Sequence, residues 1–291
     1  MSGAHPGYYL PAPSYWPVVG SVGLFCLFGG FAMYVNDVAG AAYLLVVGFL
    51  MVVVMLFGWF GAVIRESQGD RYNEQVDRSF RWGMGWFIFT EVMFFAAFFG
   101  ALFYARVYSV PWLGGEGAKA ITHTLLWPSF EAIWPLLSLP DATGFSEALE
   151  PMGAWGLPAL NTLILLSSGG TVTWAHWSLK EGNRKQLIMW LFCTVGLGIL
   201  FLMPQVIEYT HAYDEFNLKL SSGIYGTTFF MLTGFHGAHV TLGTIMLMVI
   251  LLRSMAGHFT PERHFAFEAV AWYWHFVDVV WLVLFVFVYW L

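Results

Sequence analysis

Charged residues are scarce in this chain. Only 10% of its 291 residues are Asp, Glu, Lys or Arg, whereas 58% are hydrophobic and 19% are aromatic. A soluble domain usually carries about 25% charged residues, so twelve bases and eighteen acids cannot cover a soluble fold of this length. Together with a mean hydropathy of +0.66, this shortage excludes a soluble enzyme, a nucleic-acid-binding protein and a disordered chain. It indicates an integral membrane protein.

Cysteine is nearly absent as well. Cys26 and Cys193 lie in separate apolar runs without CxxC spacing, so we expect two buried core residues and no disulfide framework. The sequence also lacks a Gly-rich phosphate loop, a nucleophile elbow and a credible catalytic triad. Its first 15 residues have neither the basic region nor the apolar core of a cleaved signal sequence, and we expect none. By itself, the sequence points to no catalytic centre.

Long apolar runs are what the sequence has in abundance. A helix needs about 20 apolar residues to cross the hydrocarbon core, and spanning strands are excluded because the runs are solidly apolar instead of alternating. We therefore predict an all-α membrane protein with seven transmembrane helices. Their approximate ranges are 16–34, 41–64, 82–104, 156–177, 187–207, 224–252 and 265–290.

The basic residues support this topology. Nine of the twelve lie in the loops after the second, fourth and sixth spans, and only Arg106, Lys119 and Lys219 lie elsewhere. The positive-inside rule then places those three loops and the N-terminus in the cytoplasm and the C-terminus outside. The long loop at about 109–155 contains an apolar patch at 133–139, and we expect it in the membrane interface or against a partner.

The acids fall mostly on the other side. Nine of them, Glu208 included, are assigned to the outer loops, and only Glu91, Glu268 and Asp278 lie inside predicted spans. The acidic outer face could attract a basic soluble partner or consist of ordinary solvated loops. Each acid inside a span is a candidate functional residue, because an ionisable side chain near the bilayer centre costs about 2.5–3.5 kcal/mol.

The candidate residues within the spans leave several interpretations open. Glu91 has no base near it in sequence, so it is protonated, hydrogen-bonded to another helix or paired with a lipid headgroup. His236 and His239 share one helix face and either ligate a metal or haem or pack as hydrogen-bonded histidines. Glu268, His275 and Asp278 share a stripe that should face protein, as a proton path or a structural network.

Six segments, read together, resemble subunit III of cytochrome c oxidase, and they cover nearly the whole chain in order. They are YYLPAPSYWPVVGS (8–21), IRES (64–67), RWGMGWFIFTEVMFF (81–95), LNTLILLSSGGTVTWAHW (160–177), YGTTFFMLTGFHGAHVTLG (225–243) and HFAFEAVAWYWHFVDVVWLVLFVFVYW (264–290).

The resemblance implies a two-helix arm at 1–70 and a five-helix bundle at 71–291, separated by a V-shaped cleft filled with lipid. It implies a subunit without redox centres that packs on subunit I and has subunit II and small subunits as further partners. Such a subunit binds phospholipids and supports proton uptake and sustained turnover. Subunits I and II would hold the haems and copper centres, and the complex would accept electrons from cytochrome c. The bacterial plasma membrane is favoured over the mitochondrial inner membrane.

Individual residues can be carried over from the family. Glu91 matches its intramembrane glutamate, Arg65 and Arg253 match bases near lipid headgroups, and His258 matches a histidine close to the second of these. Trp59 and Phe60 fall at aromatic lipid contacts of the arm. Three departures from the family pattern are Phe60, where a second tryptophan is common, Trp177, where a histidine is common, and 70–73, where some members carry histidines.

Two other functions remain as alternatives. A quinol-oxidase subunit III is related, but that relative commonly has five spans and lacks the first two. A stand-alone transporter or proton channel would use Glu91, Glu268 and Asp278. Transporters usually show internal repeats or broken helices near the bilayer midplane, and the sequence shows neither.

Overall fold

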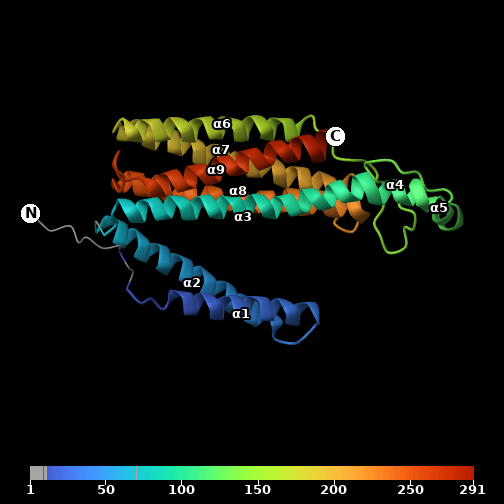
Figure 1. The fold of residues 1–291 in the computed structure, drawn as a ribbon, viewed down its shortest axis with the longest axis horizontal. Coiled ribbons are helices and arrows are strands. Elements are labelled where there is room, and N and C mark those ends of the chain that lie inside the picture. The colour runs from blue at the N-terminus through green and yellow to red at the C-terminus, as the bar shows by residue number, and fades with distance from the viewer. Residues whose placement is uncertain (1–8, 10–11, 70) are drawn as a thin grey trace, which may run out of the picture. The chain divides into compact units, whose positions relative to one another are not determined.

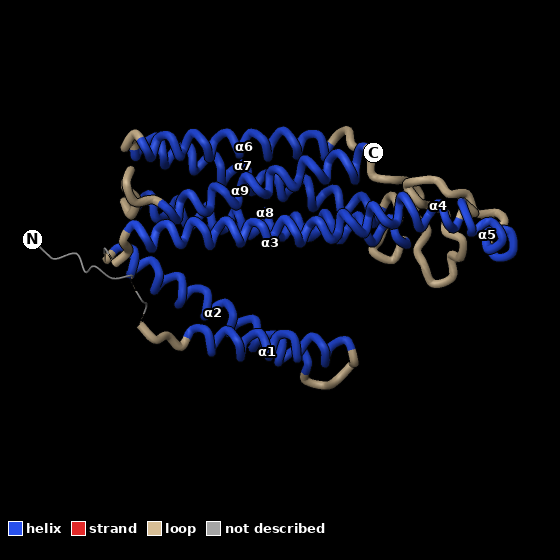
Figure 2. Tube along the Cα trace, in the orientation of Figure 1, coloured by secondary structure: helices blue, strands red, loops and turns tan. Residues whose placement is uncertain are grey.

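The computed structural model describes residues 9, 12–69 and 71–291. Within these residues the chain consists of helices and loops, with no strand (Figure 2), which confirms the all-α prediction. The chain divides into two compact units, Met1–Phe80 and Arg81–Leu291. Some of the sequence predictions fall outside the described residues. They concern most of the first 15 residues, where no signal sequence is expected, the start of the 8–21 motif, and Asp70.

The first unit contains two long helices packed through glycine. Helix α1 (Trp16–Val35) and helix α2 (Ala41–Gln68) are joined by a short turn. A Cβ atom on Gly48 would lie 2.4 Å from the backbone nitrogen of Leu27, and one on Gly30 would lie 2.7 Å from that of Leu45. Only glycine permits this approach of the two backbones, as is typical of helix pairs in membranes.

The second unit is built on long helices (Figure 1). Helix α3 (Glu74–Tyr104), which begins in the first unit, continues through a π-helix (Ala105–Ser109) into α4 (Val110–Leu113). The others are α6 (Leu157–Lys180), α7 (Arg184–Asp214), α8 (Gly223–Ala256) and α9 (Phe265–Leu284), which ends in a π-helix (Phe285–Trp290). Helix α7 packs between α6 and α8, and α9 packs on α6 and α8. Aromatic contacts place α3 against α8 and α9.

The core of the second unit is aromatic. Trp274 and Trp281 of α9 are fully buried. Their indole nitrogens donate to hydroxyls on α6, Trp274 to Ser168 and Trp281 to Thr162, both at 2.9 Å. A buried indole N–H needs an acceptor, and the hydroxyl residues of α6 supply it. The two bonds fix how α9 lies on α6.

Six helices in the described chain are long and apolar enough to cross a membrane: α1, α2, α3 with its continuation to Leu113, α7, α8 and α9 with its π-helix. Helix α6, the fourth predicted span, has 24 residues but is more polar. Several of its polar side chains are buried against neighbouring helices, including Asn161 and Ser168. A crossing by α6 stays a prediction that its length allows.

The long connection after α4 is only partly irregular. It contains a 3₁₀ turn (Gly117–Lys119) and the short helix α5 (Ala120–Leu126). The ring of Trp134 meets that of Tyr225 at 5.8 Å, and the Tyr225 hydroxyl accepts the backbone N–H of Met152 at 3.0 Å. The patch at 133–139 is divided, because Leu136 is buried while Ile133 is exposed.

The two cysteines differ from expectation in their burial. Both are free thiols with partly exposed side chains, so neither is the fully buried core residue that was predicted. Cys26 lies in α1 of the first unit and Cys193 in α7 of the second.

Candidate functional site

Glu91 on α3 has a partner on another helix. Its Oε2 lies 2.9 Å from Nε2 of His239 on α8, and both side chains are largely buried. The other ring nitrogen of His239 lies 2.6 Å from the carbonyl oxygen of Phe235. Of the three interpretations of Glu91 drawn from the sequence, the structure matches the interhelical hydrogen bond.

The chemistry of this pair fixes its net charge. A carbonyl oxygen can only accept, so Nδ1 of His239 donates to Phe235. The Nε2–Glu91 contact then holds one shared proton, as an imidazolium donating to a carboxylate or as a carboxylic acid donating to a neutral imidazole. Both forms are neutral overall. The pair therefore avoids an unpaired charge within the bundle, which would be costly there.

Glu268 on α9 is the centre of a second polar cluster. It accepts a hydrogen bond from Arg81 on α3. Its other oxygen lies 3.2 Å from Nε2 of His264 and 3.5 Å from Nε2 of His176 on α6. The Arg81 guanidinium also lies over the Phe265 ring at 5.3 Å. The cluster joins the ends of three helices on the side where α3 and α9 begin and α6 ends (Figure 1).

This cluster has the donor set of a metal site. The ligand atoms of His176, His264 and Glu268 lie within 4.8 Å of one another, and two imidazoles with a carboxylate suit a transition metal. Arg81, however, already supplies a cation to the same carboxylate. The arrangement therefore also matches an ion-pair cluster centred on Glu268. The sequence contained one signal for it, because His264 and Glu268 are four residues apart on a helix.

His236, the other histidine of the GFHGAHV motif, makes different contacts. Its ring is fully buried and stacks on Trp281, with centroids 5.2 Å apart, and meets the edge of Phe201 at 5.8 Å. His239 bonds to Glu91, so the two histidines have separate partners. His239 thus matches the interpretation of a packed, hydrogen-bonded histidine, whereas His236 is packed without a hydrogen-bond partner in the described chain.

The predicted polar stripe on α9 is interrupted. Glu268 and Asp278 are buried, but the His275 side chain is 47% exposed and its Nδ1 lies 3.6 Å from Asp278 Oδ2. The Asp278 carboxylate sits against Gly169 of α6, where a Cβ atom would come within 2.3 Å of Oδ2. The SSGG sequence of α6 therefore makes room for an acid on α9, which no sequence spacing had indicated.

The residues assigned to lipid binding divide between the two units. In the first unit, Trp59, Phe60 and Arg65 are exposed on α2, with Arg65 in its last turn. In the second unit, Arg253 lies half-buried in the last turn of α8 with its guanidinium over the Phe259 ring at 4.6 Å. The backbone N–H of His258 donates to the Arg253 carbonyl at 3.0 Å. The bases thus occupy the C-terminal turns of their helices.

The connection after α2 carries a tyrosine where the family departure falls. The Tyr72 hydroxyl donates to Glu66 Oε2 at 3.0 Å. Burial and the neighbouring Glu66 carboxylate raise the pKa of Tyr72 above its ordinary range. This bond ties the residues after α2 back to its last turn.

Glu208 corrects the assignment of acids to the outer loops. It was placed in an outer loop, because the apolar run of the fifth span ends at residue 207. The helix continues to Asp214, and Glu208 is only 1% exposed. Another buried acid therefore joins Glu91, Glu268 and Asp278. A buried acid at the end of an apolar run looks like a loop residue in sequence, and only the neighbouring helices reveal its burial.

Comparisons with known proteins find relatives along nearly the whole chain. The sequence model of a family described as "Cytochrome c oxidase subunit III" matches residues 5–126 and 119–291. The chain is 43% identical over 293 residues to "Cytochrome c oxidase subunit 3" of Marchantia polymorpha, covering 100% of this chain and 98% of the relative. It is 41% identical over 285 residues to the proteins of the same name from Dugong dugon and Papio hamadryas, covering 97% of this chain and 96% of each relative.

Proposed function

Because this chain belongs to the cytochrome c oxidase subunit III family and is a subunit of an oxidase complex, we propose that it is the accessory subunit of a proton-pumping oxidase that takes electrons from reduced cytochrome c. The redox centres are then the haems and copper centres of subunits I and II. This chain packs on subunit I, with subunit II and small subunits as further partners. It supports proton uptake and sustained turnover.

One observation carries the proposal of a supporting role: two acids within the bundle, Glu91 and Glu268, have partners on other helices of the chain. Glu91 is bonded to His239, and Glu268 is bonded to Arg81. Acids that conduct protons or ions through a transporter need access to water and a binding site between broken helices. Side chains already matched to each other instead hold helices together, which favours the accessory subunit over a stand-alone channel.

The same proposal includes bound phospholipid. Arg65 and Arg253 each end a helix that runs toward the predicted cytoplasmic side. A guanidinium at such a position presents a fork of donors to a phosphate, and a nearby phosphate lowers the cost of keeping its charge at the membrane surface. Trp59 and Phe60 would contact acyl chains. In this proposal one lipid lies against α2 of the first unit and another at the end of α8 in the second unit.

The chain is a multi-pass membrane protein by its spanning helices. We propose the bacterial plasma membrane as its location, which the resemblance favours. Its N-terminus would then lie in the cytoplasm, because nine of its twelve bases fall in the loops on that side.

Purification through an affinity tag on this chain in mild detergent tests the proposal. We expect haem and copper to copurify, and the complex to oxidise reduced cytochrome c. Copurification with activity toward quinol alone would assign the chain to a quinol oxidase. A preparation without any haem-bearing partner would contradict both oxidase assignments and favour the stand-alone transporter or proton channel.

A further inference from the structure

Five buried polar side chains lie near the predicted outer half of the second unit without hydrogen-bond partners. Nine side-chain nitrogen and oxygen atoms are involved, and each has no partner within the described chain. The residues are 0–6% exposed and come from α6, α7, α8 and the final π-helix. They are Asn161, Gln205, Glu208, His236 and Tyr289, here called the polar layer.

Contacts between antiparallel helices place these residues at one level. Thr171 on α6 bonds to Thr194 on α7 at 2.8 Å, and ten residues further along each helix Asn161 comes level with Pro204, next to Gln205. Tyr209 on α7 bonds to Thr233 on α8 at 2.7 Å, and three residues away along each helix His236 comes level with Val206, which follows Gln205.

Trp281 confirms the level from α9. Its ring stacks on His236 and its indole N–H reaches Thr162, which follows Asn161. The Tyr289 hydroxyl is close enough to interact with both Glu208 and Gln205, but it forms a regular hydrogen bond with neither. Asn161, Gln205 and His236 thus lie at about the same level of the second unit, and Glu208 and Tyr289 lie about one turn further outward.

The backbone adds one more acceptor to the layer. Pro204 lies inside α7 and is buried. Proline has no N–H, so the carbonyl of Leu200 loses its donor in the helix. Buried polar groups are nearly always hydrogen-bonded. Leaving the side chains of the polar layer and this carbonyl without partners in a dry interior would therefore cost free energy.

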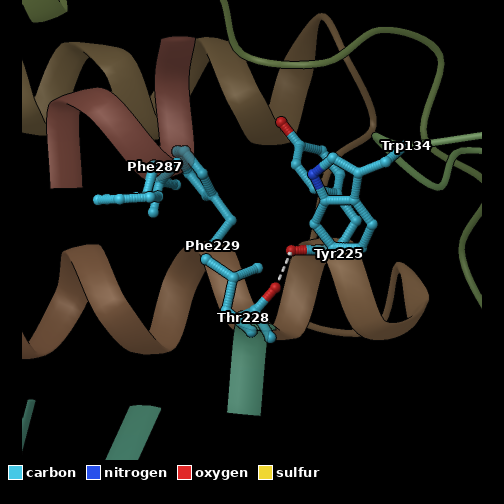
Figure 3. Close-up of a pocket in the computed structure, with 7 residues that line it drawn as sticks. Trp134, Tyr225, Thr228, Phe229 and Phe287 are labelled. Carbon is cyan, nitrogen blue, oxygen red and sulfur yellow. Dashed lines mark hydrogen bonds between the residues drawn. The ribbon is translucent and has the colours of Figure 1, made fainter. Parts of the chain in front are cut away.

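We propose that the polar layer binds a cluster of ordered water molecules inside the five-helix unit. A buried water makes about three hydrogen bonds, so each ordered water would satisfy several of these atoms. A cavity of about 10 Å³ lies nearby, between Leu102, Trp134, Tyr225, Thr228, Phe229, Phe287 and Val288 (Figure 3). Its wall residue Phe229 touches the Tyr289 ring, with centroids 5.5 Å apart, and its size is close to that of one water.

Radiolytic labelling of the purified oxidase complex tests this inference. X-ray pulses turn bound water into hydroxyl radicals, which oxidise side chains beside it even when bulk solvent has no access. We expect His236 and Tyr289 to be oxidised several-fold faster than Trp274, which is equally buried and intrinsically more reactive. Labelling of both residues no faster than that of Trp274 would mean a dry layer and overturn the inference.

Variants of Glu208 provide the second arm. Glu208→Gln keeps two hydrogen-bonding atoms at this position, so labelling of His236 should stay close to that of the parent. Glu208→Leu removes them, and the labelling should fall. Thr210→Val is the matched control on α7, because this exposed threonine bonds only to its own helix at Val206. Equal labelling in Glu208→Leu and the parent would contradict water bound at Glu208.

Discussion

The Glu91–His239 pair is a contact between two residues 148 positions apart. Replacing Glu91 by leucine leaves Nε2 of His239 without its partner inside the bundle. An unsatisfied buried group costs about 1–3 kcal/mol, so we expect Glu91→Leu to lower the temperature at which the chain dissociates from the complex. Glu91→Gln keeps an acceptor at the same place and should lie near the parent.

The pairing itself is tested by adding His239→Leu. Because the two residues share one interaction, the double variant should lose less than the sum of the single losses. Strictly additive losses would show that the two side chains act independently, against the shared proton inferred here.

Asp141 makes the outer loop sensitive to acid. Its Oδ1 accepts the backbone N–H of Thr143 at 2.9 Å, and hydrogen bonds from the Thr143 side chain and backbone hold the pKa of Asp141 below its ordinary value. The charged form is thus favoured in the folded loop. Its contribution is full above the ordinary pKa of about 4 and disappears as the pH falls through the lower folded value.

Amide exchange at Thr143 measures this effect. After correction for the intrinsic rate, protection should fall as the pH is lowered below about 4. Asp141→Asn cannot titrate and should show no such step. A step of equal size in that variant would assign the acid response to another group.

At single positions, the sequence identified residues more readily than their partners. Glu91, His239 and Glu268 were predicted because charged and imidazole groups are conspicuous in apolar runs. Arg81 could not be assigned to Glu268, since it was read as a loop residue and nothing in the sequence brings α3 to the start of α9. Asn161 and Gln205 were not predicted as candidate residues, because an uncharged amide within an apolar run does not stand out.

Among the helices, the close approach of α9 to α8 depends on one small residue. A Cβ atom on Gly243 would lie 2.8 Å from the ring of Trp274, which is fully buried. Gly243→Ala should therefore force the ring to move and destabilise the bundle by about 1–3 kcal/mol. The loss can be measured as a lower midpoint in thermal unfolding of the complex.

Gly237 on the same helix is the matched control. A Cβ atom there meets nothing within 4 Å, and alanine favours a helix over glycine by up to about 1 kcal/mol. Gly237→Ala should leave the midpoint unchanged or raise it. Equal losses in both variants would indicate a general intolerance of α8 to alanine instead of a contact with Trp274.

The sequence predicted helix boundaries only at the ends of the apolar runs. The fifth apolar run begins at Leu187, yet α7 starts at Arg184, because the Asn183 side chain accepts the backbone N–H of Gln186 and caps the helix. At its other end the helix passes the end of the apolar run and extends to Asp214. The polar turns at the ends of a helix depend on capping and on packing against neighbouring helices. A count of apolar residues detects neither.

For the whole molecule, the proposed lipid sites make the strongest prediction. Removing a guanidinium from each unit, with Arg65→Ala and Arg253→Ala together, should release bound phospholipid and speed inactivation during turnover, because each phosphate loses its fork of donors. The complex should still assemble. Lys185→Ala, an exposed base on the same predicted side, should change neither quantity. Lipid analysis that finds unchanged occupancy in the double variant would contradict the assignment.

The native cysteines allow the two units to be spin-labelled for spectroscopy. Each unit carries one free, partly accessible thiol, Cys26 in the first and Cys193 in the second. Nitroxide labels on these two thiols need no engineered substitution in this chain, once the cysteines of partner subunits are blocked or distinguished. Dipolar coupling between the labels then reports the spacing of the units as a distribution. We expect the width of that distribution to change when lipid is extracted, because phospholipid has a proposed role in both units. Recording the distribution before and after extraction measures this change.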